Sequence, residues 1–240
     1  MLAVASALAG LDERGYIVPR PHPTLVTPRV LVMEGFVGFA FYDLEGMRAA
    51  GIDTEEVIRT GMVGFMEGAM IHGIFHGDLH GGNLLVLADG QVVLLDFGIT
   101  GRLDDHRRMA FLRLLIGGTM NDLPTQIQAL IDLGALPRDT DIEAIITDLG
   151  LDGTAIDPTT LTPDEMIREL QGVMKKLLAY GARMPKELML FVKNMIFVDG
   201  AIATMAPDLD LFAEITSIAT YFATTHGARL AAEVGVDPTT

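Results

Sequence analysis

The stretch His72–Arg102, HGIFHGDLHGGNLLVLADGQVVLLDFGITGR, holds most of the side chains of this sequence that are able to do chemistry. Two short apolar runs, 84–87 and 92–95, flank an Ala-Asp-Gly turn. This pattern predicts an antiparallel hairpin. Asn83 stands directly before the hairpin and Asp96 directly after it. Because the two ends of a hairpin meet, we expect the Asn83 and Asp96 side chains to lie close together.

These side chains suit a magnesium phosphate site. Mg²⁺ prefers oxygen ligands and takes only one or two of them from the protein, with phosphates and water supplying the rest. Asn83 and Asp96 offer such a pair of oxygens and are the predicted metal ligands. Asp78, five residues before Asn83, is then free to orient or deprotonate a nucleophile during phosphoryl transfer. Asp78 is therefore the predicted catalytic residue.

Each of these residues also has a purely structural interpretation. Asp96 before Phe-Gly could form an ordinary turn, and Asn83 could cap a loop. Asp78 could be kept for the structure of the loop. We expect His76 and His80 to brace the loop rather than to react. The magnesium interpretation is favoured because the spacing and the hairpin context agree.

The spacing also matches known motifs. His76–Asn83 follows H-x-D-x-x-x-x-N, and Asp96-Phe97-Gly98 is the D-F-G triplet of protein-kinase-like enzymes. Together with RVLVMEGFVG at 29–38, the region from about residue 18 to about residue 115 resembles the UbiB/AarF (ADCK) family of atypical kinases. The resemblance implies a mostly helical α+β fold, a kinase-like C-lobe with small β-hairpins at the active site and an extra C-terminal helical layer.

The resemblance also implies roles for single residues. Asp78 is the catalytic-loop aspartate, Asn83 and Asp96 are Mg²⁺ ligands, and Met33 and Glu34 belong to the hinge that contacts the adenine of ATP. The implied cofactors are therefore Mg²⁺ and ATP. The implied function is Mg-ATP-dependent phosphoryl transfer or ATP hydrolysis, linked to ubiquinone or other isoprenoid lipid metabolism.

Parts of the family pattern are missing ahead of the hinge. All four lysines come late, at 175, 176, 186 and 193, so no lysine before the hinge can grip the α and β phosphates. Only two glycines precede the hinge, so a glycine-rich phosphate loop is missing as well. We expect a chain that is weak or inactive without a complete N-lobe, as a fragment, a split gene product or a degenerate member.

The expected organisation follows from this comparison. Residues 1–35 are a remnant of the N-lobe and hinge, 36–118 the kinase-like C-lobe core, and 119–240 a helical part of the same domain. Apolar periodicity and caps predict a strand at 29–34, a helix that begins at Asp53, and further helices at 2–13, 103–117, 121–133, 140–149, 163–180, 186–205 and 209–232.

Two other functions stay open. Aminoglycoside and choline phosphotransferases also use H-G-D-L-H-x-x-N before a D-F-G-like aspartate. The hinge sequence and Gly101-Arg102-Leu103 favour the UbiB type over them. A non-catalytic pseudokinase module that binds a partner or a lipid through its helices is the alternative from a different class.

Composition limits the partners. The 240 residues include 17 basic and 32 acidic ones, a net charge of −15, which repels nucleic acid and anionic membranes. There is no cysteine, and we found no apolar run approaching the roughly 20 residues of a membrane span. The expected partners are a nucleotide and either an isoprenoid lipid or a protein that supplies the N-lobe. The expected location is the cytoplasm, with peripheral membrane attachment as an option.

Overall fold

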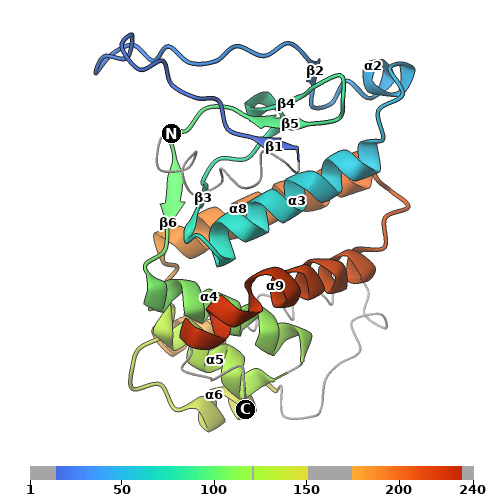
Figure 1. The fold of residues 1–240 in the computed structure, drawn as a ribbon. Coiled ribbons are helices and arrows are strands. Elements are labelled where there is room, and N and C mark those ends of the chain that lie inside the picture. Colours follow the sequence, from blue (N-terminus) through green and yellow to red (C-terminus); the bar gives the residue numbers. More distant parts are fainter. Residues whose placement is uncertain (1–14, 121, 151–174, 234–240) are drawn as a thin grey trace. The chain divides into compact units, whose positions relative to one another are not determined.

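The computed structural model describes residues 15–120, 122–150 and 175–233 (Figure 1). The chain forms two compact units, one made of the residues up to Arg102 and from Leu190 onward, the other of Leu103–Met189. We refer to them as unit 1 and unit 2. Helices dominate and the sheets are small, so the predicted α+β, mostly helical class is confirmed. The division into N-lobe remnant, C-lobe core and helical part stays a prediction.

The predicted hairpin is present in unit 1. Strand β4 (Leu84–Val86) pairs antiparallel with β5 (Val92–Leu94). Gly90 makes the turn at a φ of 87°, a conformation that glycine adopts without steric cost. The Asp89 carboxylate accepts the Gln91 N–H at 3.2 Å and fixes the turn from its other side. Local turn chemistry therefore sets the register of this hairpin.

Four further strands are described in unit 1, and two of them extend the hairpin into a sheet. β1 pairs parallel with β5 and β2 pairs antiparallel with β4, which gives a four-stranded sheet in the order β1-β5-β4-β2. β3 and β6 form a separate antiparallel pair. The bounds of these strands are Tyr16–Ile17 for β1, Phe39–Ala40 for β2, Ile74–His76 for β3 and Thr100–Arg102 for β6.

The two antiparallel pairs are nested in the sequence, and this nesting positions the site. The chain runs through β3, a loop, β4, the turn, β5, a second loop and β6. Pairing β4 with β5 and β3 with β6 brings the loops 77–83 and 95–99 side by side. Backbone bonds close both ends of this arrangement, from Gly77 N–H to Ile99 O at 2.9 Å and from Leu95 N–H to Asn83 O at 2.7 Å.

Helix α3 (Thr54–Met70) forms the core next to these loops. Asp53 caps it as predicted, because its carboxylate accepts the Glu55 and Glu56 N–H groups at 2.9 and 3.3 Å. Phe65 of α3 stacks on Phe191 of helix α8 (Lys186–Met205), with ring centroids 5.1 Å apart. Phe75 of β3 meets both rings edge-on. This aromatic cluster joins α3, β3 and α8 in unit 1.

Two glycines of α3 are expected to respond in opposite ways to alanine. A Cβ on Gly64 would lie 2.5 Å from Tyr16 Cγ, and the Tyr16 ring is buried. A Cβ on Gly61 would meet nothing within 4 Å. We predict that Gly64→Ala lowers the free energy of unfolding by about 1–3 kcal/mol through overpacking. Gly61→Ala should raise it by about 0.5–1 kcal/mol through helix propensity.

Urea denaturation of the two variants beside the wild type measures both effects. Because the substitutions sit on one helix and add the same methyl group, the difference between them isolates the contact with Tyr16. Equal shifts of the two midpoints would show that Gly64 is not needed for this packing.

Helix α9 (Leu211–Glu233) is fastened to α3 within unit 1 by polar contacts. The buried Glu67 carboxylate accepts the Tyr221 hydroxyl at 2.6 Å and lies 3.1 Å from His226 Nε2. Arg59 donates to Glu214 at 2.7 Å. The helix predicted at 209–232 is therefore confirmed. A short helix, α2 (Leu44–Ala49), was not predicted.

Unit 2 consists of helices packed on an apolar cluster. Its described helices include α4 (Asp105–Thr119), α5 (Leu123–Asp132) and α6 (Ile142–Leu149), close to the predicted bounds. Aspartates 104, 122 and 141 cap the three helices. The cluster contains Ile127, Ile131, Leu136, Ile145 and Leu149. The helix predicted at 2–13 and most of the one at 163–180 lie outside the described residues.

The strand predicted at 29–34 is not formed as a strand. This segment is held by isolated bridges, Pro21 to Met33 and Thr27 to Val30. Two backbone bonds join it to the preceding residues, His22 N–H to Val32 O at 2.7 Å and Glu34 N–H to Arg20 O at 3.0 Å. The prolines around it lack the N–H group that a continuous ladder requires, so the β-branched composition was overridden.

Among the described residues, α8 is long and apolar enough to cross a membrane when judged by length and composition alone. Core helices of this length pass the same test. Asn194, in the middle of α8, is fully buried and bonded to the loop after β3. Asn194 thus joins α8 to this loop of unit 1, while 28% of the apolar stretch of α8 is buried in the described structure.

Candidate functional site

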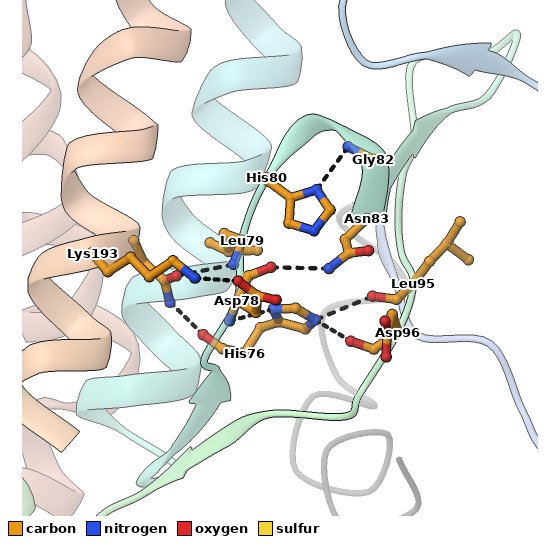
Figure 2. A network of polar contacts seen from close by, with 10 residues as sticks. His76, Asp78, Leu79, His80, Gly82, Asn83, Leu95, Asp96 and Lys193 are labelled. Atoms are coloured by element: carbon orange, nitrogen blue, oxygen red, sulfur yellow. Dashed lines mark hydrogen bonds and ion pairs between the residues drawn. The ribbon is translucent and has the colours of Figure 1, made fainter. Parts of the chain in front are cut away.

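The site lies where the loops 77–83 and 95–99 meet, as Figure 2 shows. Asn83 ends the short 3₁₀ turn Gly81–Asn83, and His80 caps that turn by accepting the Gly82 N–H at 3.1 Å. The Asn83 side chain is buried, and its Nδ2 donates to the Asp78 carbonyl oxygen at 3.0 Å. One hydrogen bond thus ties the two ends of the loop 77–83 to each other.

His76 joins the two loops through hydrogen bonds of both its ring nitrogens. Its Nδ1 accepts the Asp78 N–H at 3.1 Å, and a backbone N–H can only donate, so the proton of the neutral ring is on Nε2. Nε2 donates to the carbonyl oxygens of Leu95, at 3.1 Å, and of Asp96. Phe97 packs edge-on against the ring with centroids 5.7 Å apart. The prediction that His76 and His80 brace the loop is confirmed.

Burial lowers the pKa of His76 below its ordinary value, because the charged imidazolium loses hydration there. The carbonyl oxygens of Asp96 and Leu95 and the nearby Asp78 and Asp96 carboxylates oppose this shift without reversing it. His76 is therefore a neutral structural link at neutral pH.

Asp96 has an unusual backbone conformation. Its φ of 53° is the only positive φ at a non-glycine residue in the described ranges, and strained backbone positions of this kind cluster at functional sites. Asp96 Oδ1 accepts the Gly98 N–H at 3.0 Å. One oxygen of Asp96, Oδ1, therefore forms the turn that the structural interpretation predicts. Oδ2 makes no hydrogen bond among the described residues, so it can serve a ligand.

The donor set fits a hard divalent cation. Asn83 and Asp96 stand at the same end of the hairpin, on either side of the bond from Leu95 N–H to Asn83 O. Neither Asn83 Oδ1 nor Asp96 Oδ2 is used in a hydrogen bond within the described part of the chain. Among the described residues no three His, Cys, Asp or Glu side chains form a metal cluster. A magnesium site with phosphate ligands needs no such cluster.

Asp78 is on the same loop and is paired with a lysine. Its Oδ1 accepts a hydrogen bond from Lys193 Nζ of helix α8, and this ion pair lowers the pKa of the Asp78 carboxyl. Asp78 is therefore a carboxylate at neutral pH. Oδ2 makes no hydrogen bond in the described ranges, which leaves it open to accept a proton. The structure thus places Asp78, Asn83 and Asp96 on the two loops that meet at this end of the hairpin, and their roles stay predictions.

The sequence matches a known family. A family model for the ABC1 atypical kinase-like domain covers residues 4–129, more than half of the 240 residues. The chain belongs to the ABC1 atypical kinase-like family. This confirms the resemblance to UbiB/AarF atypical kinases and the kinase-like fold. The H-x-D-x-x-x-x-N loop and the D-F-G triplet of this ABC1 family chain are the two loops described above.

Several curated proteins are similar to this ABC1 family chain. An uncharacterized protein of Mycobacterium tuberculosis strain H37Rv is 29% identical over 214 residues, 86% of this chain and 42% of that protein. Protein ACTIVITY OF BC1 COMPLEX KINASE 1, chloroplastic, of Arabidopsis thaliana is 27% identical over 198 residues, 82% of this chain and 29% of that protein. An uncharacterized aarF domain-containing protein kinase, chloroplastic, from the same plant is 28% identical over 216 residues, 80% and 40% respectively.

The chain spans less than half the length of these relatives. Among solved structures, the complex of Rv3197 with erythromycin from Mycobacterium tuberculosis matches with a TM-score of 0.43 and 17% identity. That match covers 77% of this chain and 53% of the solved chain.

The hinge residues predicted for this ABC1 family chain lie on the segment with isolated bridges. Glu34 is exposed, and its Oε2 accepts the Arg20 N–H at 2.9 Å. Met33 is half-buried and bridges to Pro21. Neither hinge residue shares a hydrogen bond with the Asp78 loop in the described part of the structure. Their role in binding adenine stays a prediction.

Sequence reasoning missed two residues of the site, both on α8. Lys193 pairs with Asp78, and Asn194 bonds to the backbone on either side of it, at the His76 carbonyl oxygen and at the Leu79 N–H, the latter at 3.0 Å. The available signal was that these two polar residues interrupt an otherwise apolar helix.

Proposed function

We infer that this chain forms the magnesium and phosphate side of an ATP-dependent active site that performs phosphoryl transfer or ATP hydrolysis. One observation carries the proposal: Asn83 and Asp96 stand at the same end of the hairpin, where Leu95 N–H bonds to Asn83 O, and Asp78 is on the same loop as Asn83 (Figure 2). Membership in the ABC1 atypical kinase-like family supports the same chemistry.

Each of the three side chains has a defined task in this proposal. Asn83 Oδ1 and Asp96 Oδ2 would hold the cation, and Mg²⁺ when bound would neutralise phosphate charge. Asp78 orients the hydroxyl group or water that attacks. A bond forms between the acceptor oxygen and the terminal phosphorus while the bond from that phosphorus to the ADP oxygen breaks. The acceptor proton passes to Asp78 Oδ2.

The ion pair with Lys193 tunes this base. By lowering the pKa of Asp78 it keeps the carboxylate charged and ready to accept a hydrogen bond at neutral pH, but it also weakens Asp78 as a proton acceptor. Asp78 therefore acts mainly by orienting the acceptor, as expected where the transition state needs little proton removal.

The remaining predictions are part of the same proposal. The hinge at Met33 and Glu34 would contact adenine, and a complete N-lobe would supply the lysine that grips the α and β phosphates. An isoprenoid lipid acceptor, as the family resemblance implies, and a cytoplasmic location stay predictions. Because turnover depends on the N-lobe, nucleotide binding is the more direct measurement on this chain.

The test uses Mn²⁺ in place of Mg²⁺, with electron paramagnetic resonance to count bound metal at increasing ATP. We expect ATP-dependent Mn²⁺ binding, and Asp96→Asn should weaken it by about tenfold or more, since even outer-shell partners of a bound metal contribute about 10- to 100-fold in affinity. Asparagine tolerates the positive φ of Asp96 and can still accept the Gly98 N–H, so the loop should keep its shape.

Asp89→Asn is the matched control, because it makes the same change at the opposite end of the same hairpin, where Asp89 only fixes the turn. It should leave Mn²⁺ binding unchanged. If Asp96→Asn binds Mn-ATP as tightly as the wild type, the metal site is elsewhere. A wild type that binds no Mn-ATP at all would favour the non-catalytic pseudokinase module.

A further inference from the structure

Helix α8 carries Lys193, which pairs with the predicted catalytic residue Asp78 although the two are 115 positions apart in the sequence. Lys193 Nζ pairs with Asp78 Oδ1, and Figure 2 shows the lysine side chain reaching from α8 to the loop. Its neighbour Asn194 is fully buried and bonded to the backbone of His76, two residues before Asp78, and of Leu79, directly after it. The backbone of Lys193 is therefore fixed relative to the loop.

The site carries negative charges that need a compensating positive charge, and Lys193 supplies one. Asp78 and Asp96 place two carboxylates where the phosphates of ATP would bind, and unshielded phosphates would be repelled. The lysines at 175, 176 and 186 all fall in unit 2, so Lys193 is the one lysine of the sequence that belongs to unit 1. It lies directly beside the predicted base.

The Lys193 ammonium group also has room for a second partner. Its side chain is 54% exposed, against 31% for Asp78, and Asp78 is its hydrogen-bond partner among the described residues. An ammonium group has three donors, and one of them serves Asp78. The others can reach a ligand that enters beside Asp78.

We propose that Lys193 binds the terminal phosphoryl group of ATP and is a further catalytic residue of this site. This rests on the proposed function. Lys193 makes and breaks no covalent bond: its positive charge faces the non-bridging oxygens of the group in transfer, whose negative charge it stabilises. Lys193, from the C-terminal part of the chain, thus offsets the charge of the terminal phosphate at the catalytic loop. This role differs from that of the lysine that grips the α and β phosphates in kinase-like folds.

The alternative is a narrower role, in which Lys193 only positions Asp78. The two roles differ in what the nucleotide must carry. A contact with the terminal phosphoryl group favours ATP over ADP, whereas positioning Asp78 affects turnover without distinguishing the two nucleotides. The ratio of the ATP and ADP affinities therefore reports on the direct contact.

The experiment is calorimetric titration of the full chain with Mg-ATP and with Mg-ADP. Lys193→Met should weaken Mg-ATP binding by about tenfold or more, because hydrogen bonds to charged groups contribute strongly. Mg-ADP binding should change by less than about twofold, the range of ordinary surface substitutions. Lys193→Arg keeps the charge and should keep most of the preference for ATP. Lys186→Met, an exposed lysine on the same helix, should alter neither affinity.

A second background separates the two roles further. In Asp78→Asn protein there is no carboxylate left to position, and Lys193→Met should still reduce the ratio of ATP to ADP affinity. Thermal unfolding of each variant beside Lys186→Met shows whether the chain still folds. The half-exposed position of Lys193 makes its substitution tolerable.

The outcomes distinguish the two proposals. If Lys193→Met weakens both nucleotides equally, weakens neither, or acts only while Asp78 is present, the proposal for Lys193 is wrong and the magnesium site stands. If the wild type binds neither Mg-ATP nor Mg-ADP, both proposals are overturned.

Discussion

Asn194→Leu is expected to lower the free energy of unfolding by about 2–5 kcal/mol, since each buried polar group left without a partner costs about 1–3 kcal/mol. Asn194 is fully buried, accepts the Leu79 N–H at 3.0 Å and donates to the His76 carbonyl oxygen. Leucine has nearly the same size but neither donor nor acceptor. The substitution therefore leaves two backbone groups of the catalytic loop unpaired in an apolar environment.

Urea denaturation of the full chain measures this loss. Ile196→Ala, which truncates a side chain of α8 that is 70% exposed, is the control for the helix and should shift the free energy by less than about 0.5 kcal/mol. Asn194→Asp keeps the acceptor for Leu79 but places a carboxylate against the His76 carbonyl oxygen, so it should be destabilising too. A leucine variant as stable as the wild type would mean that the loop does not depend on α8.

The geometry of the site could be predicted because it is encoded locally. The hairpin follows from two apolar runs around a glycine turn, and the pairing of β4 with β5 then fixes where Asn83 and Asp96 must lie. No long-range information was needed for that step. The bond from Leu95 N–H to Asn83 O is the direct consequence of that pairing.

The contribution of α8 could not be predicted because it depends on tertiary packing. Lys193 and Asn194 lie 115 residues from their partners Asp78 and Leu79. Within α8 they looked only like interruptions of an apolar run. A buried asparagine in such a helix does predict a hydrogen-bond partner, but the sequence does not say which one.

The prediction of a strand at 29–34 was wrong for a different reason. Its β-branched residues favour a strand, yet β propensity describes a fit to a half-buried pleated surface, and Val30 and Leu31 are more than half exposed here. Without a neighbouring strand to cover them, only isolated bridges form. The partners of this segment are as close in sequence as those of the hairpin, so what separates the two cases is the missing cover and the prolines that interrupt the ladder.

His76→Leu is the second substitution with a large expected effect. It removes the acceptor of the Asp78 N–H and the donor to the carbonyl oxygens of Leu95 and Asp96. His76 is 2% exposed, so water cannot replace the lost partners easily. We expect a loss of about 2–5 kcal/mol in the free energy of unfolding, at the cost of about 1–3 kcal/mol for each unpaired buried group. Denaturation in urea at pH 7.5 measures it.

Acid should produce part of the same effect in the wild type. Since burial lowers the pKa of His76, the unfolded chain binds a proton at this residue more readily than the folded one. Stability from His76 is therefore complete above about pH 6.5, the ordinary histidine value, and is lost as pH falls from there through the folded pKa. The expected slope reaches at most about 1.4 kcal/mol per pH unit. His76→Leu must lack this component, so the difference in stability between wild type and variant should shrink between pH 7 and pH 5. A difference that stays constant over that range would show that His76 is not held neutral by the fold.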